Sequence, residues 1–169
     1  IDTGSLTKHL RAEQASENSK SIANFVANNF SSTLKGIRVG LHSANFIHKV
    51  LGTASMETFT QTFRDLSKNT LPKWTETMPK STNIDMYFEQ KVSDKKVVYF
   101  PSCITRSMGL NSISKEEKQL FTVTVELLQK AGYQILFPHN LSDLCCGMPF
   151  SSKGFKEAAQ TKSSQLEEE

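Results

Sequence analysis

The sequence predicts a mixed α/β chain, in which an N-terminal helical bundle precedes a small parallel β-α-β-α unit. Apolar residues recur at helical spacing through residue 70. Two short apolar runs, around Val97 and Ile135, are each stopped by a proline, and a helical pattern lies between them. Strand, helix and strand in this order imply a right-handed crossover, so the two strands should be parallel.

Residues 1–70 are expected to form the helical region. A short helix follows the turn residues Thr3 and Gly4, and three longer amphipathic segments come after it. Their apolar stripes consist of Ile22, Phe25, Val26 and Phe30, then Leu34, Ile37, Leu41, Ala44, Ile47, Val50 and Leu51, and then Met56, Phe59, Phe63 and Leu66. Amphipathic helices joined by short breaks pack as a small bundle.

Residues 71–94 lack any such period. They contain Pro72, Pro79 and the only tryptophan of the chain, Trp74. This composition predicts a linker on the surface, pinned down by Trp74.

Residues 95–169 begin the α/β unit. The apolar run 97–100 ends at Pro101 and is typical of a strand buried on both faces of a parallel sheet. The run YQILFP predicts a second strand, again ended by a proline, and the last fifteen residues start another helix.

The helix between the two strands has recognisable ends. Ser114 and Glu117 are spaced as a capping box, and Gly132 is a typical C-terminal residue. The side expected to be buried consists of Leu120, Val123, Leu127, Leu128 and Ala131.

Composition excludes several classes of protein. The net charge is only +3 without a cluster of lysine and arginine, so no nucleic-acid partner is expected. No apolar run approaches the roughly 20 residues of a bilayer span, and no signal peptide is present. A cytoplasmic location is therefore expected. The first residue is Ile1 and the last, Glu169, lies inside a helical pattern, which predicts a piece excised from a larger polypeptide.

The three cysteines follow the two predicted strands. Cys103 comes just after the first strand, and Cys145 and Cys146 lie on the loop after the second. Both loops leave the carboxyl edge of a parallel sheet, so the thiols should gather there, with Gly147 allowing the turn. The N-terminus of the next helix should favour thiolates. Three thiolates suit iron–sulfur or zinc but leave the site one ligand short.

Other interpretations of these residues stay open. His139 could supply the missing ligand, although a histidine after a strand is usually a loop residue. Each cysteine alone could be a small buried apolar side chain. A strained disulfide between Cys145 and Cys146 is a further alternative.

At these residues the chain resembles a known family. FPSC, which ends at Cys103, and LCCGMPF, which carries Cys145, Cys146 and Gly147, resemble the cysteine-rich CCG domain of heterodisulfide reductase B subunits. Relatives include iron–sulfur subunits of glycolate oxidase and of anaerobic glycerol-3-phosphate dehydrogenase, and bacterial FAD-linked D-lactate dehydrogenases of the iron–sulfur type. The resemblance covers about residues 95–155. The family's later Cys-x-x-Cys is absent from this chain, and the gap before the cysteine pair is longer than usual.

The N-terminal IDTGSLTKHLR resembles the segment that follows a two-cluster ferredoxin module in FAD-fused members of the family. The resemblance implies an oxidoreductase of the D-lactate or glycolate type. In it, FAD and ferredoxin-like domains upstream in the same polypeptide would pass electrons to a 4Fe–4S type centre held in part by Cys103, Cys145 and Cys146. The implied acceptor is a quinone or cytochrome, which would place the protein at the inner face of a membrane, and this fragment would hold no catalytic residue and have no turnover of its own.

Two rival functions use the same residues. In the first, the chain is a structural or partner-docking module whose thiols bind zinc or stay free. In the second, Cys145 and Cys146 form a thiol–disulfide switch.

Overall fold

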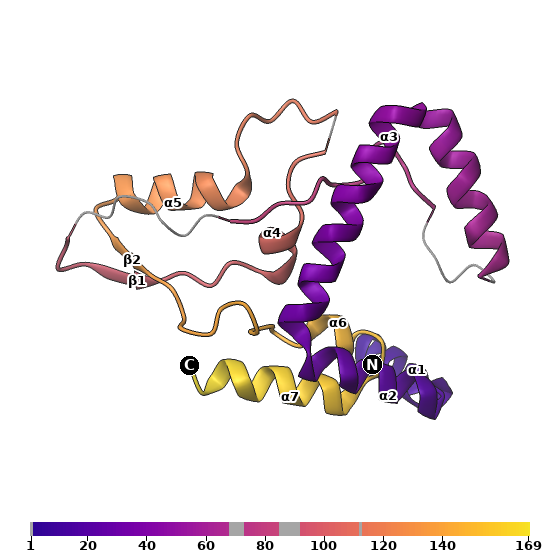
Figure 1. Cartoon of the computed structure of the whole chain (residues 1–169). Coiled ribbons are helices and arrows are strands. Elements are labelled where there is room, and N and C mark those ends of the chain that lie inside the picture. Colours follow the sequence, from indigo (N-terminus) through magenta and orange to yellow (C-terminus); the bar gives the residue numbers. More distant parts are fainter. Residues whose placement is uncertain (1, 68–72, 85–91, 112) are drawn as a thin grey trace. The chain divides into compact units, whose positions relative to one another are not determined.

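The computed structural model describes residues 2–67, 73–84, 92–111 and 113–169 (Figure 1). The chain divides into two compact units. Unit 1 consists of Ile1–Leu34, Lys96–Cys103 and Ile135–Glu169, and unit 2 of Lys35–Lys95 and Ile104–Gln134. The units are described separately below, and the domain boundaries expected from sequence stay a prediction.

The N-terminal part is helical, as predicted. Helices α1 (Thr3–Gln14), α2 (Glu17–Asn28) and α3 (Phe30–Leu66) follow one another with short breaks. Each of the first two begins at a side-chain cap, because the Asp2 carboxylate accepts from the Ser5 N–H at 3.0 Å and Ser16 Oγ accepts from the Ser19 N–H at 3.2 Å.

Helix α3 contains a sharp break at Gly52. This residue has φ +74° and ψ 172°, a conformation that interrupts the helix and that residues with a Cβ rarely adopt. The break lies where the sequence predicts the boundary between two amphipathic segments. In unit 2 the chain turns back there as a helical hairpin (Figure 1).

Small residues of α2 face the core of unit 1. In α2 the buried residues are Ala23 and Ala27, and Phe30 and Leu34 at the start of α3 join them in the core. Ile22 and Phe25, which the sequence places on the buried stripe, are exposed, so that part of the prediction is wrong. Two alanines one turn apart allow α2 to pack closely on the C-terminal helix α7 (Lys156–Glu167), whose Ala158 is buried in the same cluster.

Strands β1 (Lys96–Val98) and β2 (Gln134–Leu136) form a two-stranded parallel sheet, as predicted. The Gln134 N–H donates to the Lys95 carbonyl, and further on the Tyr99 N–H donates to the Leu136 carbonyl. The residue numbers of the paired residues increase in the same direction along both strands, as in a parallel sheet.

The expectation that the first strand is buried on both faces is wrong. Val98 is 64% exposed, and the strand reads exposed, half-buried, exposed. In β2 only Ile135 is fully buried. No further strand of the described chain joins this sheet, so side chains of β1 keep contact with solvent.

Two helices lie between the strands in sequence. The short α4 (Cys103–Ser107) was not predicted, and α5 (Leu120–Lys130) begins later than the proposed capping box. Ser114 Oγ accepts from the Glu116 N–H, which makes a local turn and caps no helix. Gly132 follows the end of α5 with φ +82°, as expected for its C-terminal position.

Helix α5 buries a different face from the predicted one. Phe121 and Val125, one turn apart, are buried, whereas Leu120, Val123 and Leu127 are exposed.

Trp74 of unit 2 is buried, as expected for a residue that anchors its segment. Its ring contacts that of His48, with 4.2 Å between centroids and an angle of 38° between the ring planes. None of the helices described combines the length and the hydropathy needed to cross a bilayer.

Candidate thiol site

The parallel sheet brings Cys103 and Cys145 to the same edge. The chain leaves β1 through Pro101 and reaches Cys103, the first residue of α4. It leaves β2 through a loop and reaches Cys145 shortly before α6 (Met148–Ser151). Loops after parallel strands emerge at one edge, so this juxtaposition follows from the strand pairing described above. All three cysteines are free thiols.

The thiols of Cys103 and Cys145 share a hydrogen bond. The side chain of Cys145 is 1% exposed, and it lies in the core cluster of unit 1 with Phe30 and Phe150. Cys103 is half-buried and packs against the same cluster. The pair therefore sits with one face in an apolar core.

These surroundings hold the proton on Cys145. The hydrogen bond with Cys103 raises the pKa of the Cys145 thiol far above its ordinary value of 9.0, and burial raises it further. The N–H of Gly147 donates to the same sulfur and lowers the pKa, but by less. The Gly147 N–H at the helix N-terminus thus acts in the expected direction, but the hydrogen bond with Cys103 and burial outweigh it, so the expected thiolate is not favoured at Cys145.

Cys146 does not join this pair in the core. Its side chain is exposed although that of its neighbour, Cys145, is buried, so the two adjacent side chains diverge. Cys145 and Cys146 still interact electrostatically, because a negative charge on Cys146 would raise the pKa of Cys145.

Gly147 is left-handed, as the sequence predicts, with φ +74°. A Cβ at this position would lie 2.6 Å from the carbonyl oxygen of Ala159 in α7. The glycine therefore serves two purposes, the turn after the cysteines and the close approach of α7. That close approach is a second reason for the glycine that the CCG motif alone does not reveal.

The residues present fit a metal or an iron–sulfur cluster only in part. Within the described residues, no three histidine, cysteine, aspartate or glutamate side chains come close enough together to hold a metal ion. Cys103 and Cys145 supply two adjacent sulfurs, and Cys146 would have to turn toward them. A cysteine thiol must also lose its proton to become a ligand, and the surroundings of Cys145 oppose that loss.

His139 lies on the loop after β2, as expected. Its backbone N–H donates to Glu169 Oε2 at 3.1 Å, and Glu169 Oε1 accepts from the neighbouring Asn140 amide at 2.6 Å. These bonds tie the loop to the C-terminal end of α7. His139 belongs to no three-residue metal-binding group in the described part of the chain.

A buried lysine lies in the core that holds Cys145. The side chain of Lys162 is 1% exposed, its Nζ is 2.6 Å from Gln165 Oε1, and it stands 5.0 Å from the centroid of the Phe30 ring. Buried ammonium groups are rare unless they are paired in this way. Sequence pattern does not indicate this burial, because a lysine in a polar helix is ordinarily exposed.

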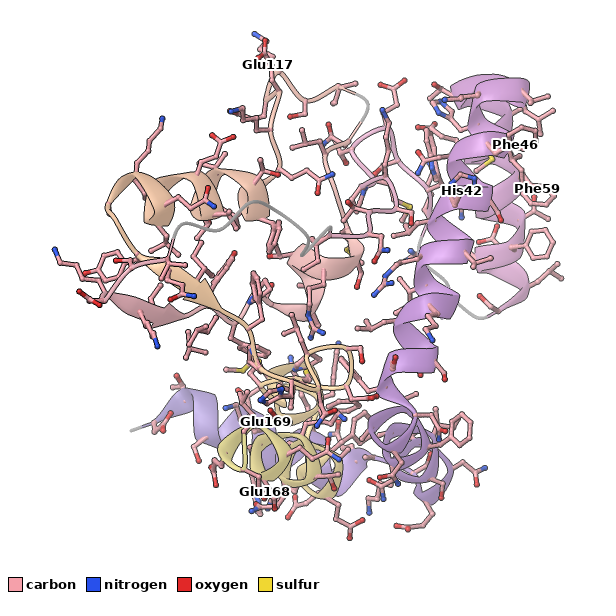
Figure 2. All side chains as sticks on the ribbon, turned by 60° about the vertical axis from the view of Figure 1, so that its left-hand side comes forward. His42, Phe46, Phe59, Glu117, Glu168 and Glu169 are labelled. Atoms are coloured by element: carbon pink, nitrogen blue, oxygen red, sulfur yellow. The ribbon has the colours of Figure 1, made fainter. Side chains whose placement is uncertain are left out.

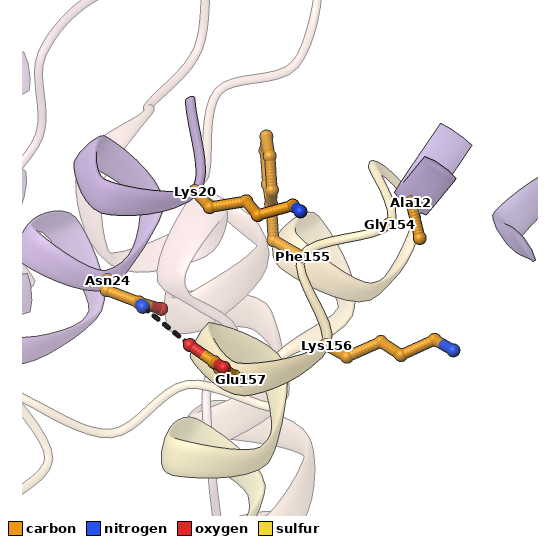
Figure 3. A pocket seen from close by; sticks show the side chains of 7 residues that line it. All are labelled: Ala12, Lys20, Asn24, Gly154, Phe155, Lys156 and Glu157. Carbon is orange, nitrogen blue, oxygen red and sulfur yellow. Dashed lines mark hydrogen bonds between the residues drawn. The ribbon is translucent and has the colours of Figure 1, made fainter. Parts of the chain in front are cut away.

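A small pocket of about 200 Å³ lies elsewhere in unit 1 (Figure 3). Lys20 and Asn24 of α2, Ala12 of α1 and the start of α7 line it, and Asn24 Nδ2 donates to Glu157 Oε2 at 2.9 Å. Gly154 at its edge has φ +86°, and a Cβ there would lie 2.5 Å from the Ala12 nitrogen. The pocket contains no cysteine or histidine.

Comparison with protein families, with curated proteins and with solved structures finds nothing similar to this chain.

Proposed function

We propose that the chain is part of an FAD-linked iron–sulfur oxidoreductase that oxidises a 2-hydroxy acid of the D-lactate or glycolate type. In this proposal Cys103, Cys145 and Cys146 are ligands of an electron-relay centre. The remaining cysteine donors lie in the segment that follows this chain, and the FAD and the substrate site lie on FAD and ferredoxin-like domains upstream in the same polypeptide. A quinone or cytochrome accepts the electrons. The fragment alone has no turnover.

The observation that carries the proposal is the contact between the thiols of Cys103 and Cys145. Two residues far apart in sequence meet because β1 and β2 are parallel. A family in which a cysteine after one strand and a Cys-Cys-Gly after the next share a centre requires this juxtaposition. The resemblance supports the identity of that centre.

Each cysteine has its own task in this proposal. Cys103 and Cys145 are the ligands on the core side of the centre, where Phe30 and Phe150 of the core cluster exclude water. Exposed Cys146 is free to turn toward a centre at the edge of the sheet, next to Gly147. An iron–sulfur cluster bound there would supply one-electron transfer. Binding would release the proton that Cys145 holds, so uptake should increase with pH.

Anaerobic reconstitution tests the proposal. The chain extended by the segment that follows it in the parent polypeptide is incubated with iron and sulfide, and visible absorption and bound iron are measured. We expect a cluster spectrum that Cys145→Ser abolishes. Ala158→Ser is the matched control, since Ala158 is also 1% exposed in the same core but offers no thiol. A colourless extended protein with reduced cysteines would contradict the proposal.

One observation favours the alternative, a docking module with zinc-bound or free thiols. Only two of the three thiols meet, and the raised pKa of Cys145 favours its protonated form. Metal analysis of anaerobically purified protein separates the two. One equivalent of zinc without iron, or no metal at all in the extended protein, would favour the alternative.

A further inference from the structure

The first segment of α3 presents an uncovered apolar stripe in unit 2. Val39, Phe46 and Val50 are 66%, 65% and 67% exposed. At 100° per residue they fall within about 40° of arc, and they span roughly 16 Å of helix. Three large apolar side chains are thus aligned on one exposed side. Figure 2 labels Phe46 on this segment.

A row of basic residues runs beside this stripe. Lys35, His42 and Lys49 follow one another at seven-residue intervals, and all three are exposed. Lys35 and His42 precede Val39 and Phe46 by four residues, the spacing of neighbours on a helix surface. The basic row and the apolar stripe are therefore contiguous (Figure 2 labels His42).

The charge on this segment has a single sign. Residues 35–51 contain three lysines or arginines and two histidines but no aspartate or glutamate. On the other side of the stripe lie Gly36 and Gly40, which have no side chain. A Cβ added at either glycine would meet no atom within 4 Å, so this side is open. The surface is thus narrow, apolar along its centre, cationic on one side and open on the other.

We propose that this face of α3, defined by Val39, Phe46, Val50, Lys35 and Lys49, binds the surface of an anionic phospholipid bilayer. A helix with an apolar stripe and basic residues beside it lies in the membrane interface, where the apolar side chains enter the acyl boundary and the ammonium groups meet phosphate. The absence of acidic residues on the segment favours lipid over a helical protein partner, whose contacts usually combine charges of both signs. The proposal is independent of the thiol site, which is on unit 1.

Vesicle co-sedimentation of the 169-residue chain tests the proposal. We expect binding to vesicles of phosphatidylglycerol mixed with phosphatidylcholine, little binding to phosphatidylcholine alone, and weaker binding at high salt. Lys35→Glu with Lys49→Glu should weaken binding by at least about tenfold, because each basic residue near the surface contributes roughly fivefold. Phe46→Ser should weaken it by about tenfold as well.

A matched double variant controls for net charge. Lys115→Glu with Lys153→Glu changes the charge equally at two exposed lysines that are not part of α3 and should bind like the unaltered chain. Equal loss in both double variants would overturn the proposal, and so would equal binding to the two kinds of vesicle. A lipid-free dimer in sedimentation velocity that Phe46→Ser disperses would also overturn it, since the face would then be a contact between copies of the chain.

A second measurement avoids any dependence on variants that disturb folding. Phe46→Trp keeps the stripe apolar, and the emission of Trp74 is subtracted with the unaltered chain. A blue shift on adding the phosphatidylglycerol vesicles, and none with phosphatidylcholine alone, supports the proposal. An unshifted spectrum with both overturns it.

Discussion

Cys145 is held between two opposing influences on its proton. Its hydrogen bond with Cys103 and its burial raise the pKa, and the Gly147 N–H lowers it. The first two dominate, so the folded chain keeps the thiol protonated. A helix N-terminus near a cysteine is therefore insufficient to produce a thiolate when a second thiol and an apolar core lie closer.

This balance makes stability depend on pH. Because the pKa of Cys145 is raised above its ordinary value of 9.0, the folded protein holds the proton more strongly than the unfolded chain. The contribution is complete below that value and is lost as the pH rises above it. Urea unfolding of reduced protein at about pH 8 and about pH 10 should show a fall in the free energy of unfolding that is smaller in Cys145→Ser. Cys146→Ser should keep the fall, and an equal fall in all three proteins would contradict this explanation.

Gly147 offers a second residue-scale test. Gly147→Ala should lower the free energy of unfolding by more than the roughly 1–2 kcal/mol of a left-handed residue, because its Cβ would also lie 2.6 Å from the Ala159 oxygen. Gly132→Ala is the control, since Gly132 is also left-handed, with φ +82°, but a Cβ there meets nothing within 4 Å. Equal losses in urea unfolding would show that the contact with α7 is not limiting.

At the scale of elements, the sequence predicts where most helices lie better than it predicts which face of each helix is buried. The periodicity located the longer helices and the break at Gly52, although not the short α4 and α6, because amphipathic spacing and a left-handed glycine act locally. It failed for α2, for α5 and for much of α3, where Val50 and Leu66 are exposed, because large apolar residues were assumed to be buried. The structure instead buries Ala23 and Ala27, where α2 approaches α7, and that choice depends on a partner helix distant in sequence.

The caps give an element-scale prediction. Ser16→Ala should destabilise the protein by about 1 kcal/mol, because Ser16 Oγ accepts from the Ser19 N–H at the start of α2. Ser114→Ala should have a much smaller effect, since Ser114 starts a turn and α5 begins at Leu120. Urea unfolding of both variants measures the difference. A larger loss for Ser114→Ala would restore the capping box inferred from sequence.

At the scale of the whole molecule, the sequence specified the strand order and hence the meeting of two thiols. Proline-ended apolar runs with a helix between them suffice for that, since a helical connection lets the second strand run in the same direction as the first. The exposure of Cys146 was not predictable, because adjacent side chains after a turn are directed by backbone angles that the motif does not encode. Val98 was misjudged because its burial depends on covering elements that the described chain does not provide.

Parallel pairing of β1 and β2 brings Cys103 and Cys145 together. Cysteine-selective isotope labelling tests it most directly, because the chain has only three cysteines and each can be assigned with a Cys→Ser variant. In the reduced protein we predict a nuclear Overhauser effect between the Cβ protons of Cys103 and Cys145. Its absence, with Cys103 close to neither of the other two cysteines, would contradict the account.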